Sequence, residues 1–433
     1  MKILIVSNSP WRNDNSFGNS YSNLFDGIHE QIEIANVYLK HGTPNCTIVK
    51  TFFQISERSL IRNLLHPKYP TGERRLPDTT ATNAEAKDAR VFDKVRPFKG
   101  PLLIWARTVV WKIGRWKSRE LKEFVDALAP DLLFIPIYYS HYIHDINFWI
   151  KNRCGIPAVG YISDDNYSLR KISFNPLFWI DRLIMRRRLR KVFAVCDIVY
   201  TISENQKEYL RQRFGDKFKV LTKYAEFDKS NKPAGFRPHV PLRMLYTGNL
   251  GSGRYSSICL IVKALRQVNV HEQRIVFDIY TSTVLSEKLR SRLNTAETTL
   301  HDAVSFEKVL ELQRRADILV HVEGLSLKER LDVAHSFSTK IVDYLQQCKP
   351  IFVVGKDDCA SIRYFTDNDS GIVAQNYDEI VRKLTAVAAS PEILEDYAEK
   401  AWTCGEKNHR KSIHQEALKN DLFNVVKQTN KTR

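Results

Sequence analysis

Short apolar runs alternate with segments of helical periodicity along most of the chain. The runs over 2–7, 131–139 and 156–162 are apolar except at their ends, as expected of strands buried on both faces. Polar loops follow them, and then stretches whose apolar residues stand three or four apart, which is typical of helices. This alternation predicts an α/β protein.

The alternation is interrupted between Asp228 and Pro241, where three prolines and a glycine indicate a linker. A chain of 433 residues is also too long for one ordinary core, and two domains of ~200 residues each are the natural expectation. We therefore expect one α/β domain over residues 1–235, a second over 236–405, and a C-terminal helix over 406–433 that packs back on the first domain.

The stretch 337–355 predicts a loop, a short helix, a stop at Lys349-Pro350 and a buried strand. Ser338 is placed to cap the helix, whose first N–H groups would bind an anion. Lys340 and Asp343 share its polar side. Donors and a cation suit a diphosphate, and a carboxylate one turn on can accept the hydroxyls of a ribose. The alternative is an ordinary capped helix with a solvated polar face.

A glycine-rich turn follows the strand predicted near 243–247. Gly248, Gly251 and Gly253 let the backbone come close to a phosphate, and Arg254 can pair with it. Their spacing is not that of the dinucleotide-binding fingerprint. Near the N-terminus we expect a polar loop from Asn8 to Tyr21 that contains Gly18, and strand, loop and helix in this order open many nucleotide-binding units.

Polar residues also follow two predicted strands of the first half. His141 comes after the strand near 131–139, and Asp164 and Asp165 come after the strand that ends at Ile162. Active-site groups of parallel sheets gather at such ends, so all three are candidates. The alternative for each is a helix cap or a solvated loop group. Further strands are expected near 47–53, 275–280, 303–306 and 318–322.

The charge of the chain favours anionic partners. Lys and Arg total 66 against 49 Asp and Glu, a net charge of +17. Residues 94–122 carry nine basic residues and one acid, interleaved with Trp105, Trp111 and Trp116, and residues 182–191 carry six basic residues and no acid. A basic amphipathic helix with tryptophans suits an anionic membrane surface. A core-facing helix with a solvated basic face fits the first stretch equally well.

Cysteine usage and hydropathy indicate a compartment. Seven cysteines are scattered without any C-x-x-C pair, which indicates a reducing environment and argues against a zinc site. The apolar run at the N-terminus is too short for a signal peptide, and no run approaches the ~20 apolar residues of a membrane span. We expect a cytoplasmic protein, with attachment to the inner face of the cell membrane as an option.

Together these motifs resemble nucleotide-sugar glycosyltransferases of the GT-B fold, α/β proteins with two Rossmann-like parallel-sheet domains that face each other across a cleft. Within that fold the chain is similar to glycosyltransferase family 4, especially its bacterial surface-polysaccharide members. The likeness is strongest in Tyr246-Thr247-Gly248-Asn249-Leu250, in 316–320 and in 338–345. In the first half it depends on Gly18, 155–157 and 197–203.

The resemblance implies transfer of a sugar from a nucleoside diphosphate donor to a polysaccharide or lipid-linked saccharide, with retention of configuration and with no metal or other cofactor. It places the following residues at the donor: Gly248, Asn249, Gly251, Arg254, Glu323, Ser338, Thr339, Lys340 and Asp343. Gly18 falls on the acceptor side. The catalytic candidates are His141, Asp164, Asp165 and His335; an inverting enzyme would need a base among the first three.

This sequence departs from the family pattern at two places. Family 4 usually carries two glutamates separated by seven residues, and here His335 and Asp343 take their places. Asn249 stands where an arginine is usual, so neutralisation of the phosphates falls to Arg254 and Lys340. The pattern Asp367-Asn368-Asp369 matches the D-x-D of metal-dependent glycosyltransferases, but a three-residue match is common by chance.

Two other functions remain open from the sequence. A nucleotide-sugar epimerase would keep the fold and need no acceptor. A non-enzymatic protein that binds nucleic acid or another anionic surface would explain the charge of +17. No nucleic-acid module is recognisable, so nucleic acid is not an expected partner.

Overall fold

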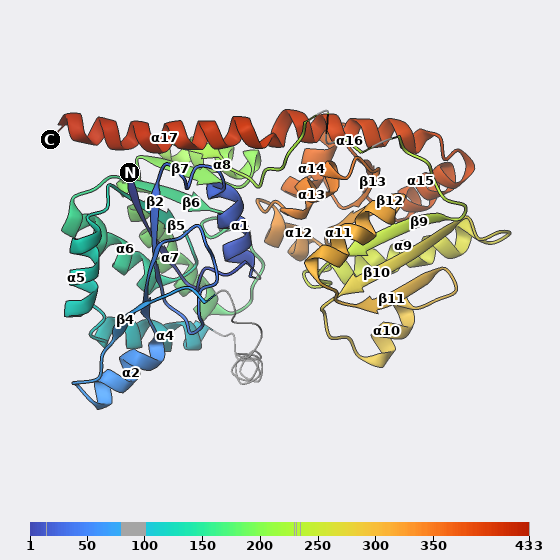
Figure 1. The fold of residues 1–433 in the computed structure, drawn as a ribbon. Helices are drawn as coiled ribbons and strands as arrows, with labels where there is room; N and C mark the ends of the chain where they lie inside the picture. Colours follow the sequence, from blue (N-terminus) through green and yellow to red (C-terminus); the bar gives the residue numbers. More distant parts are fainter. Residues whose placement is uncertain (14, 79–100, 229, 231, 234, 433) are drawn as a thin grey trace. The chain divides into compact units, whose positions relative to one another are not determined.

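The computed structural model describes residues 1–433 except 14, 79–100, 229, 231, 234 and 433, and it leaves the side chains of 101–104 and 432 undescribed. The chain divides into two compact units (Figure 1). Unit 1 comprises Met1–Leu169, Ser173–Leu221 and Ile413–Arg433, and unit 2 comprises Arg170–Ile172 and Thr222–Ser412. The domain limits expected from the sequence, at 235 and 405, stay predictions.

Unit 1 is built on an eight-stranded sheet in the order β4-β3-β2-β1-β5-β6-β7-β8. Its neighbouring strands are parallel, except that β4 pairs antiparallel with β3 at one edge. The strands are β1 (Lys2–Ser7), β2 (Glu33–Tyr38), β3 (Thr51–Ile55), β4 (Gly72–Arg75), β5 (Leu132–Pro136), β6 (Ala158–Ile162), β7 (Ile198–Thr201) and β8 (Phe218–Val220).

Helices cover this sheet, and one of them is the last helix of the chain (Figure 1). They are α1 (Ser16–Phe25), α2 (Glu57–Leu65), α4 (Pro101–Ile113), α5 (Arg119–Leu128), α6 (His141–Cys154), α7 (Pro176–Val195), α8 (Glu204–Phe214) and α17 (Lys411–Thr432). Asp421 of α17 accepts hydrogen bonds from the Tyr200 hydroxyl at 2.7 Å and from the Lys219 ammonium at 2.6 Å. These bonds fix α17 to β7 and β8.

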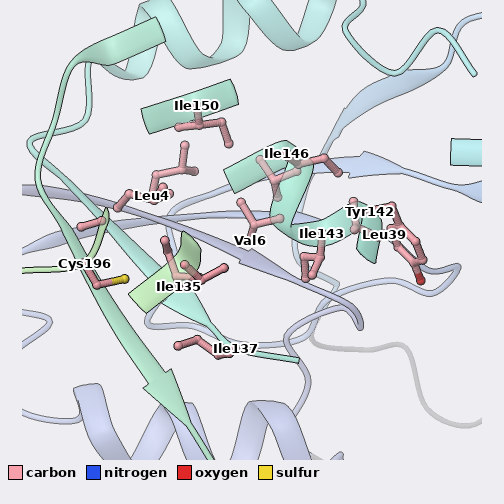
Figure 2. Packing of buried hydrophobic residues seen from close by; sticks show 14 of the residues in the cluster. Leu4, Val6, Leu39, Ile135, Ile137, Tyr142, Ile143, Ile146, Ile150 and Cys196 are labelled. Atoms are coloured by element: carbon pink, nitrogen blue, oxygen red, sulfur yellow. The ribbon is translucent and has the colours of Figure 1, made fainter. Parts of the chain in front are cut away.

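The core of unit 1 lies where β1 and β5 meet α6. Figure 2 shows Leu4, Val6 and Ile135 of the strands beside α6 residues, among them Ile143 and Ile146. The apolar residues of α6 recur at positions 143, 146 and 150, so one side of the helix faces the sheet. All of these side chains are buried. Burial of each stabilises the fold by ~1.5–3 kcal/mol relative to exposure.

Unit 2 has a six-stranded sheet in the order β11-β10-β9-β12-β13-β14, all parallel. Its strands are β9 (Leu242–Thr247), β10 (Ile275–Thr281), β11 (Thr298–Asp302), β12 (Ile318–Val322), β13 (Ile351–Val354) and β14 (Ile372–Ala374). Its helices are α9 (Arg254–Val268), α10 (Glu287–Leu293), α11 (Phe306–Arg315), α12 (Leu327–Val333), α13 (Lys340–Gln346), α14 (Ala360–Asp367), α15 (Tyr377–Ala389) and α16 (Ile393–His409).

Several elements confirm the sequence predictions. The strands over 2–7, 275–280 and 318–322 are present within a residue or two. The alternation of strand and helix, which predicted an α/β protein, is therefore correct for both units.

Three local predictions were wrong. The loop predicted over 8–21 is shorter, because Asn15 caps α1 by accepting from the Gly18 N–H at 2.7 Å. A side chain at Gly18 would place its Cβ 1.9 Å from the Arg12 carbonyl oxygen, so close packing explains this glycine. The strand predicted at 303–306 lies earlier, at Thr298–Asp302, and Ser305 caps α11. Ser338 does not cap α13, whose cap position is Thr339 with no side-chain bond.

In the part of the chain that the structure describes, none of the helices combines the length and the apolar character that crossing a membrane requires. The part of the basic stretch that covers 94–100 lies outside the described residues.

We expect Phe134→Ala in β5 to lower the stability of unit 1 by ~3–5 kcal/mol. Phe134 is fully buried, and its ring lies 5.3 Å from that of Phe25. Guanidinium unfolding followed by tryptophan fluorescence measures this, since every tryptophan except Trp402 lies in unit 1. The control is Leu76→Ala, because Leu76 is 84% exposed; equal midpoints for the two variants would contradict the assignment of the core.

Candidate functional site

The site begins at the point in unit 2 where the strand order reverses. β9 pairs with β10 on one side and with β12 on the other, and all three strands run in the same direction. The connections after β9 and β12 therefore diverge at this edge, where open α/β sheets bind their ligands. Gly248 follows β9 directly, and Glu323 follows β12. Both were predicted from the sequence to belong to one site.

Lys340 brings a cation to this edge. Its ammonium donates to the carbonyl oxygen of Thr247, the last residue of β9, at 2.9 Å. A Cβ at Gly248 would lie 2.3 Å from that ammonium, so any larger residue there would require the end of the lysine side chain to move. Part of the Lys340 side chain remains exposed. Desolvation and the charge of Arg254 lower the pKa of Lys340 to about 8.

Arg254, the first residue of α9, supplies a second cation. Its Nη2 lies 3.0 Å from Oε2 of Glu323, and its Nε donates to the same oxygen at 3.1 Å. Among the described residues none accepts from Nη1, so one edge of the guanidinium is available to a ligand. Burial raises the pKa of Glu323 against the effect of Arg254. Glu323 therefore fixes the direction of Arg254.

His321 adds a neutral ring behind the two cations. It is buried in β12, and its Nε2 lies 3.7 Å from Oε1 of Glu323 without a hydrogen-bond partner among the described residues. Burial, together with repulsion from Arg254 and Lys340, lowers the pKa of His321 to about 3. The ring is therefore uncharged at neutral pH and leaves the positive charge of the site to Arg254 and Lys340.

Asp343 lies one turn along α13 from Lys340, and the ammonium of Lys223 donates to its Oδ1 at 2.5 Å. Burial raises the pKa of Asp343, and Lys223 opposes this rise. No described residue donates to its second oxygen, Oδ2. The carboxylate thus keeps one oxygen for another donor.

The other candidates of unit 2 surround these groups. Gly251 and Asn249 form the exposed turn after β9, in which the Tyr246 hydroxyl donates to the Asn249 carbonyl oxygen at 2.7 Å. Ser338 and Thr339 precede α13, and the carbonyl oxygen of Ser338 accepts from Ile341 at 3.0 Å. His335 is buried just after α12.

In unit 1 the candidate His141 belongs to a buried cluster. Its Nε2 lies 3.1 Å from Oδ1 of Asp181, which also accepts from Trp105 Nε1 at 2.8 Å. The Tyr139 hydroxyl donates to the other oxygen of Asp181 at 2.7 Å. Burial favours the neutral acid, yet these three bonds outweigh it and hold the pKa of Asp181 below its usual value. His141 is thereby oriented by a charged partner.

Asp165 and Asp164 differ in their surroundings although they are neighbours. Asp165 is buried and accepts from the Ser168 N–H at 2.8 Å, and its carbonyl oxygen accepts from Arg182 at 2.8 Å. Asp164 is exposed, and its carbonyl oxygen accepts from Gln206 at 3.0 Å. Asp165 therefore anchors the loop after β6 as a buried group, and its catalytic role stays a prediction.

The structure brings Gly248, Arg254, Glu323, Lys340 and Asp343 together in unit 2. His141, Asp164, Asp165 and Gly18 belong to unit 1. Sequence reasoning missed Lys223, Asp181 and His321. The sequence did contain a signal for His321, because a histidine stands within the apolar run 318–322. It contained no signal for Lys223 and Asp181, which lie 120 and 40 residues from their partners.

Two cations beside a glycine turn, with a carboxylate one helical turn away, can hold a ligand with adjacent phosphate and hydroxyl groups. Among the described residues no cluster of three His, Cys, Asp or Glu side chains is arranged to hold a metal ion. The pattern Asp367-Asn368-Asp369 lies at the end of α14, and Asp369 pairs with Lys400 at 2.8 Å.

The chain consists of two α/β units, each built on a mainly parallel sheet, and a comparison with solved structures identifies the fold class. HepE from Anabaena in complex with UDP and glucose is 10% identical and matches with a TM-score of 0.59, over 98% of this chain and 100% of that chain. Sucrose-phosphate synthase from Thermosynechococcus elongatus is 10% identical, with a TM-score of 0.60, over 98% of this chain and 99% of that one. The chain has the GT-B fold, as its sequence predicted.

A glycosyltransferase from Rickettsia africae is 11% identical and matches over 100% of both chains with a TM-score of 0.59. At such identities the likeness concerns the fold alone. No protein-family model matches the sequence, and a search of curated proteins finds no match either.

We expect the binding of pyrophosphate to weaken as the pH rises above about 8, the pKa of Lys340. Only the ammonium form attracts the anion, and its population falls ~tenfold for each pH unit above the pKa. Calorimetric titration between pH 7 and pH 9 measures the effect. Lys340→Arg is the matched variant, because an arginine stays charged over this range. If the affinity for pyrophosphate fell equally with pH in the parent protein and in the Lys340→Arg variant, Lys340 would not have this role.

Proposed function

We propose that the chain is a glycosyltransferase that uses a nucleoside diphosphate sugar as donor. The observation that carries this proposal is the group of Lys340 and Arg254 beside Gly248, with Asp343 one turn along α13. A diphosphate with an adjacent ribose presents the complementary charges and hydroxyls in the same order.

The two cations would stabilise the leaving group. When the bond between the sugar and the diphosphate breaks, negative charge grows on the phosphate oxygens. Groups already in position at that charge lower the barrier without reorganisation. Arg254 is held in direction by Glu323, and Lys340 by the Thr247 carbonyl oxygen. We propose on this basis that transfer needs no metal ion, since these side chains supply the positive charge that a divalent metal supplies elsewhere.

Asp343 would bind the ribose. Lys223 occupies Oδ1 and keeps the carboxylate charged, while Oδ2 accepts a hydroxyl. A charged acceptor makes hydrogen bonds roughly twice as strong as a neutral one. The sequence prediction that Asp343 replaces the usual second glutamate is thus compatible with its surroundings.

The similar structures support this donor class. HepE has been solved with UDP and with UDP-glucose, and we infer from it that a uridine diphosphate sugar is the first donor to test.

The proposed acceptor is a saccharide or lipid-linked saccharide of the kind assembled into bacterial surface glycans, because the sequence resembles family 4 enzymes of that class. The same resemblance supports retention. In an inverting enzyme, His141 oriented by Asp181 would be the base.

The basic stretches bear on a peripheral membrane role. Trp111 is buried and stacks on Tyr142, and Arg107 pairs with Glu57 at 2.6 Å. Trp111 therefore packs inward, which supports the core-facing alternative for that side of the helix, whereas the Arg107 side chain stays 37% exposed. In the second stretch Arg182 is buried and Arg188 bonds to the His141 carbonyl oxygen at 2.9 Å.

Along α7 one stripe of side chains is exposed. Ile180, Leu183 and Ile184 are 47%, 51% and 45% exposed, and Arg187 and Lys191 continue the same face. The only acid of α7, Asp181, is buried. Exposed apolar residues followed by cations suit the headgroup region of an anionic bilayer. We propose that this stripe gives the cytoplasmic enzyme a peripheral contact with the membrane.

We expect UDP or a UDP-sugar to raise the melting temperature, because a ligand at ~100 times its dissociation constant adds ~2.7 kcal/mol of stability. A thermal-shift panel of nucleotides and nucleotide sugars measures this. Arg254→Ala and Lys340→Met should abolish the shift, and Arg266→Ala, an exposed position on α9, should keep it.

A turnover assay then uses the nucleotide sugar that gives the largest thermal shift. We expect release of nucleoside diphosphate only when a saccharide acceptor is present, and we expect the same release with and without EDTA. Isomerisation of the donor without acceptor would instead indicate an epimerase.

We expect the double variant Arg187→Glu with Lys191→Glu to lose binding to phosphatidylglycerol vesicles. Each cation near an anionic surface contributes ~1 kcal/mol, so removal of two costs roughly thirtyfold in affinity. Co-sedimentation measures it, with phosphatidylcholine vesicles as the uncharged reference. The control is Lys112→Glu with Arg115→Glu, exposed cations of the other basic stretch. If the α7 variant binds as well as the parent protein, this surface is not the contact.

A further inference from the structure

A groove of about 920 Å³ crosses the outside of unit 1. Its walls are α6, the segment 111–120 between α4 and α5, and residues 67–71 between α2 and β4. All of its lining residues belong to unit 1. The groove follows α6 from Tyr142 to Asn152, a length of ~15 Å at 1.5 Å per residue. This volume and length exceed what a single small ion would need.

The walls of the groove are joined by hydrogen bonds and ring contacts. The Thr71 hydroxyl donates to the Arg115 carbonyl oxygen at 3.0 Å, which ties two of the walls together. Trp111 stacks on Tyr142 with ring centres 4.6 Å apart, and Trp116 meets Trp149 edge-on at 5.9 Å. These contacts join the segment 111–120 to α6. The groove is therefore a preformed feature, with little ordering left for a ligand to impose.

Aromatic and basic side chains dominate the lining. Six of its twenty residues are aromatic, compared with 11% of the whole chain. Five are cations and two are acids, namely Lys68, Lys112, Arg115, Lys117, Arg119, Asp145 and Glu120. Asp145 is already paired with Arg188, outside the lining. No described carboxylate forms an ion pair with Lys68, Lys112 or Arg115, so the groove is complementary to negative charge.

The shape and the rings select among anionic ligands. A bilayer is flat and meets protruding residues, whereas this site is concave. Single-stranded nucleic acid needs open ring faces on which bases stack. Here Trp111 and Tyr142 cover each other, and Lys117 lies over Trp116 at 5.2 Å. What the lining leaves to a ligand is mainly apolar side-chain surface and exposed cations, which suits a chain that carries charged groups without requiring ring stacking.

We propose that this groove binds an anionic saccharide chain, with carboxylate or phosphate groups at Lys68, Lys112 and Arg115 and sugar rings along α6. The proposal rests on the glycosyltransferase function and narrows its acceptor to a charged glycan. Lys112 and Arg115 are exposed at the mouth of the groove, so they can meet a ligand without movement of the core.

Calorimetric titration of the full chain with a hexamer of galacturonic acid, and with the neutral maltohexaose, tests the proposal. We expect the charged hexamer to bind at least about tenfold tighter, and its affinity to fall as salt is added. Lys112→Glu with Arg115→Glu should lose about tenfold, and Lys112→Gln with Arg115→Gln should lose part of that. The matched control is Arg187→Glu with Lys191→Glu on α7, which should bind the hexamer as the parent protein does.

Equal affinity for the charged and the neutral hexamer would overturn the proposal, and so would unchanged binding by the Lys112 and Arg115 variants. Binding of an oligo-dT strand as tight as that of the hexamer would overturn it too, because the groove would then accept any polyanion. Circular dichroism and melting temperature establish that each variant is folded. The titration requires neither a donor nor turnover, so a negative result would concern the groove alone and would not affect the proposed donor site. A negative thermal-shift panel would concern the donor site, and the groove would still be tested by the titration.

Discussion

The hydrogen bond from the Lys340 ammonium to the carbonyl oxygen of Thr247 is the contact on which the candidate site depends. It joins the start of α13 to the end of β9 across 93 residues of sequence. Because β9 also pairs with β12, the same edge receives Glu323 and, through it, Arg254. One lysine thus links the glycine turn, the second cation and the helix that carries Asp343. A residue larger than glycine at 248 would displace the Lys340 ammonium from its present position.

Charge is distributed in the site so that little of it is buried without a partner. Arg254 has Glu323, Asp343 has Lys223, and His321 stays neutral because it is buried and because protonation would place a third positive charge behind two others. The two cations sit at the ligand edge, whereas Glu323 is buried. A site of this kind holds its positive charge ready before any anion arrives. Such preorganisation is what stabilises a developing charge efficiently.

The sequence predicted the fold well, because the information it used is local. Short apolar runs such as 318–322 favour strands buried on both faces, and the structure places β12 there. The candidate residues of unit 2 were visible for the same reason, since the glycines follow one strand and the Lys/Asp pair stands at helical spacing. The sequence failed over 8–21 and at 303–306, where the capping residues Asn15 and Ser305 start helices inside the predicted loop and strand.

What no single sequence shows is which distant residues meet. The sequence around Asp343 does not predict its contact with Lys223, and the sequence around His141 does not predict its cluster with Asp181 and Trp105. The same limit explains the basic stretches. Helical spacing shows that Trp111 and Arg107 share α4 with exposed cations, but it does not show that Glu57 and Tyr142 turn both of them inward.

The inward tryptophans also change the meaning of the net charge of +17. Had they pointed outward, aromatic rings and cations together would have formed one continuous membrane face. Because they pack against α6, they become the walls of a concave site, and the cations of the same segment stand at its mouth. The basic residues that α7 leaves outside accompany exposed aliphatic side chains instead. Exposed cations of unit 1 thus occur both in a concave site and on an exposed helix face beside aliphatic side chains, and two surfaces of such different character suit different anionic partners.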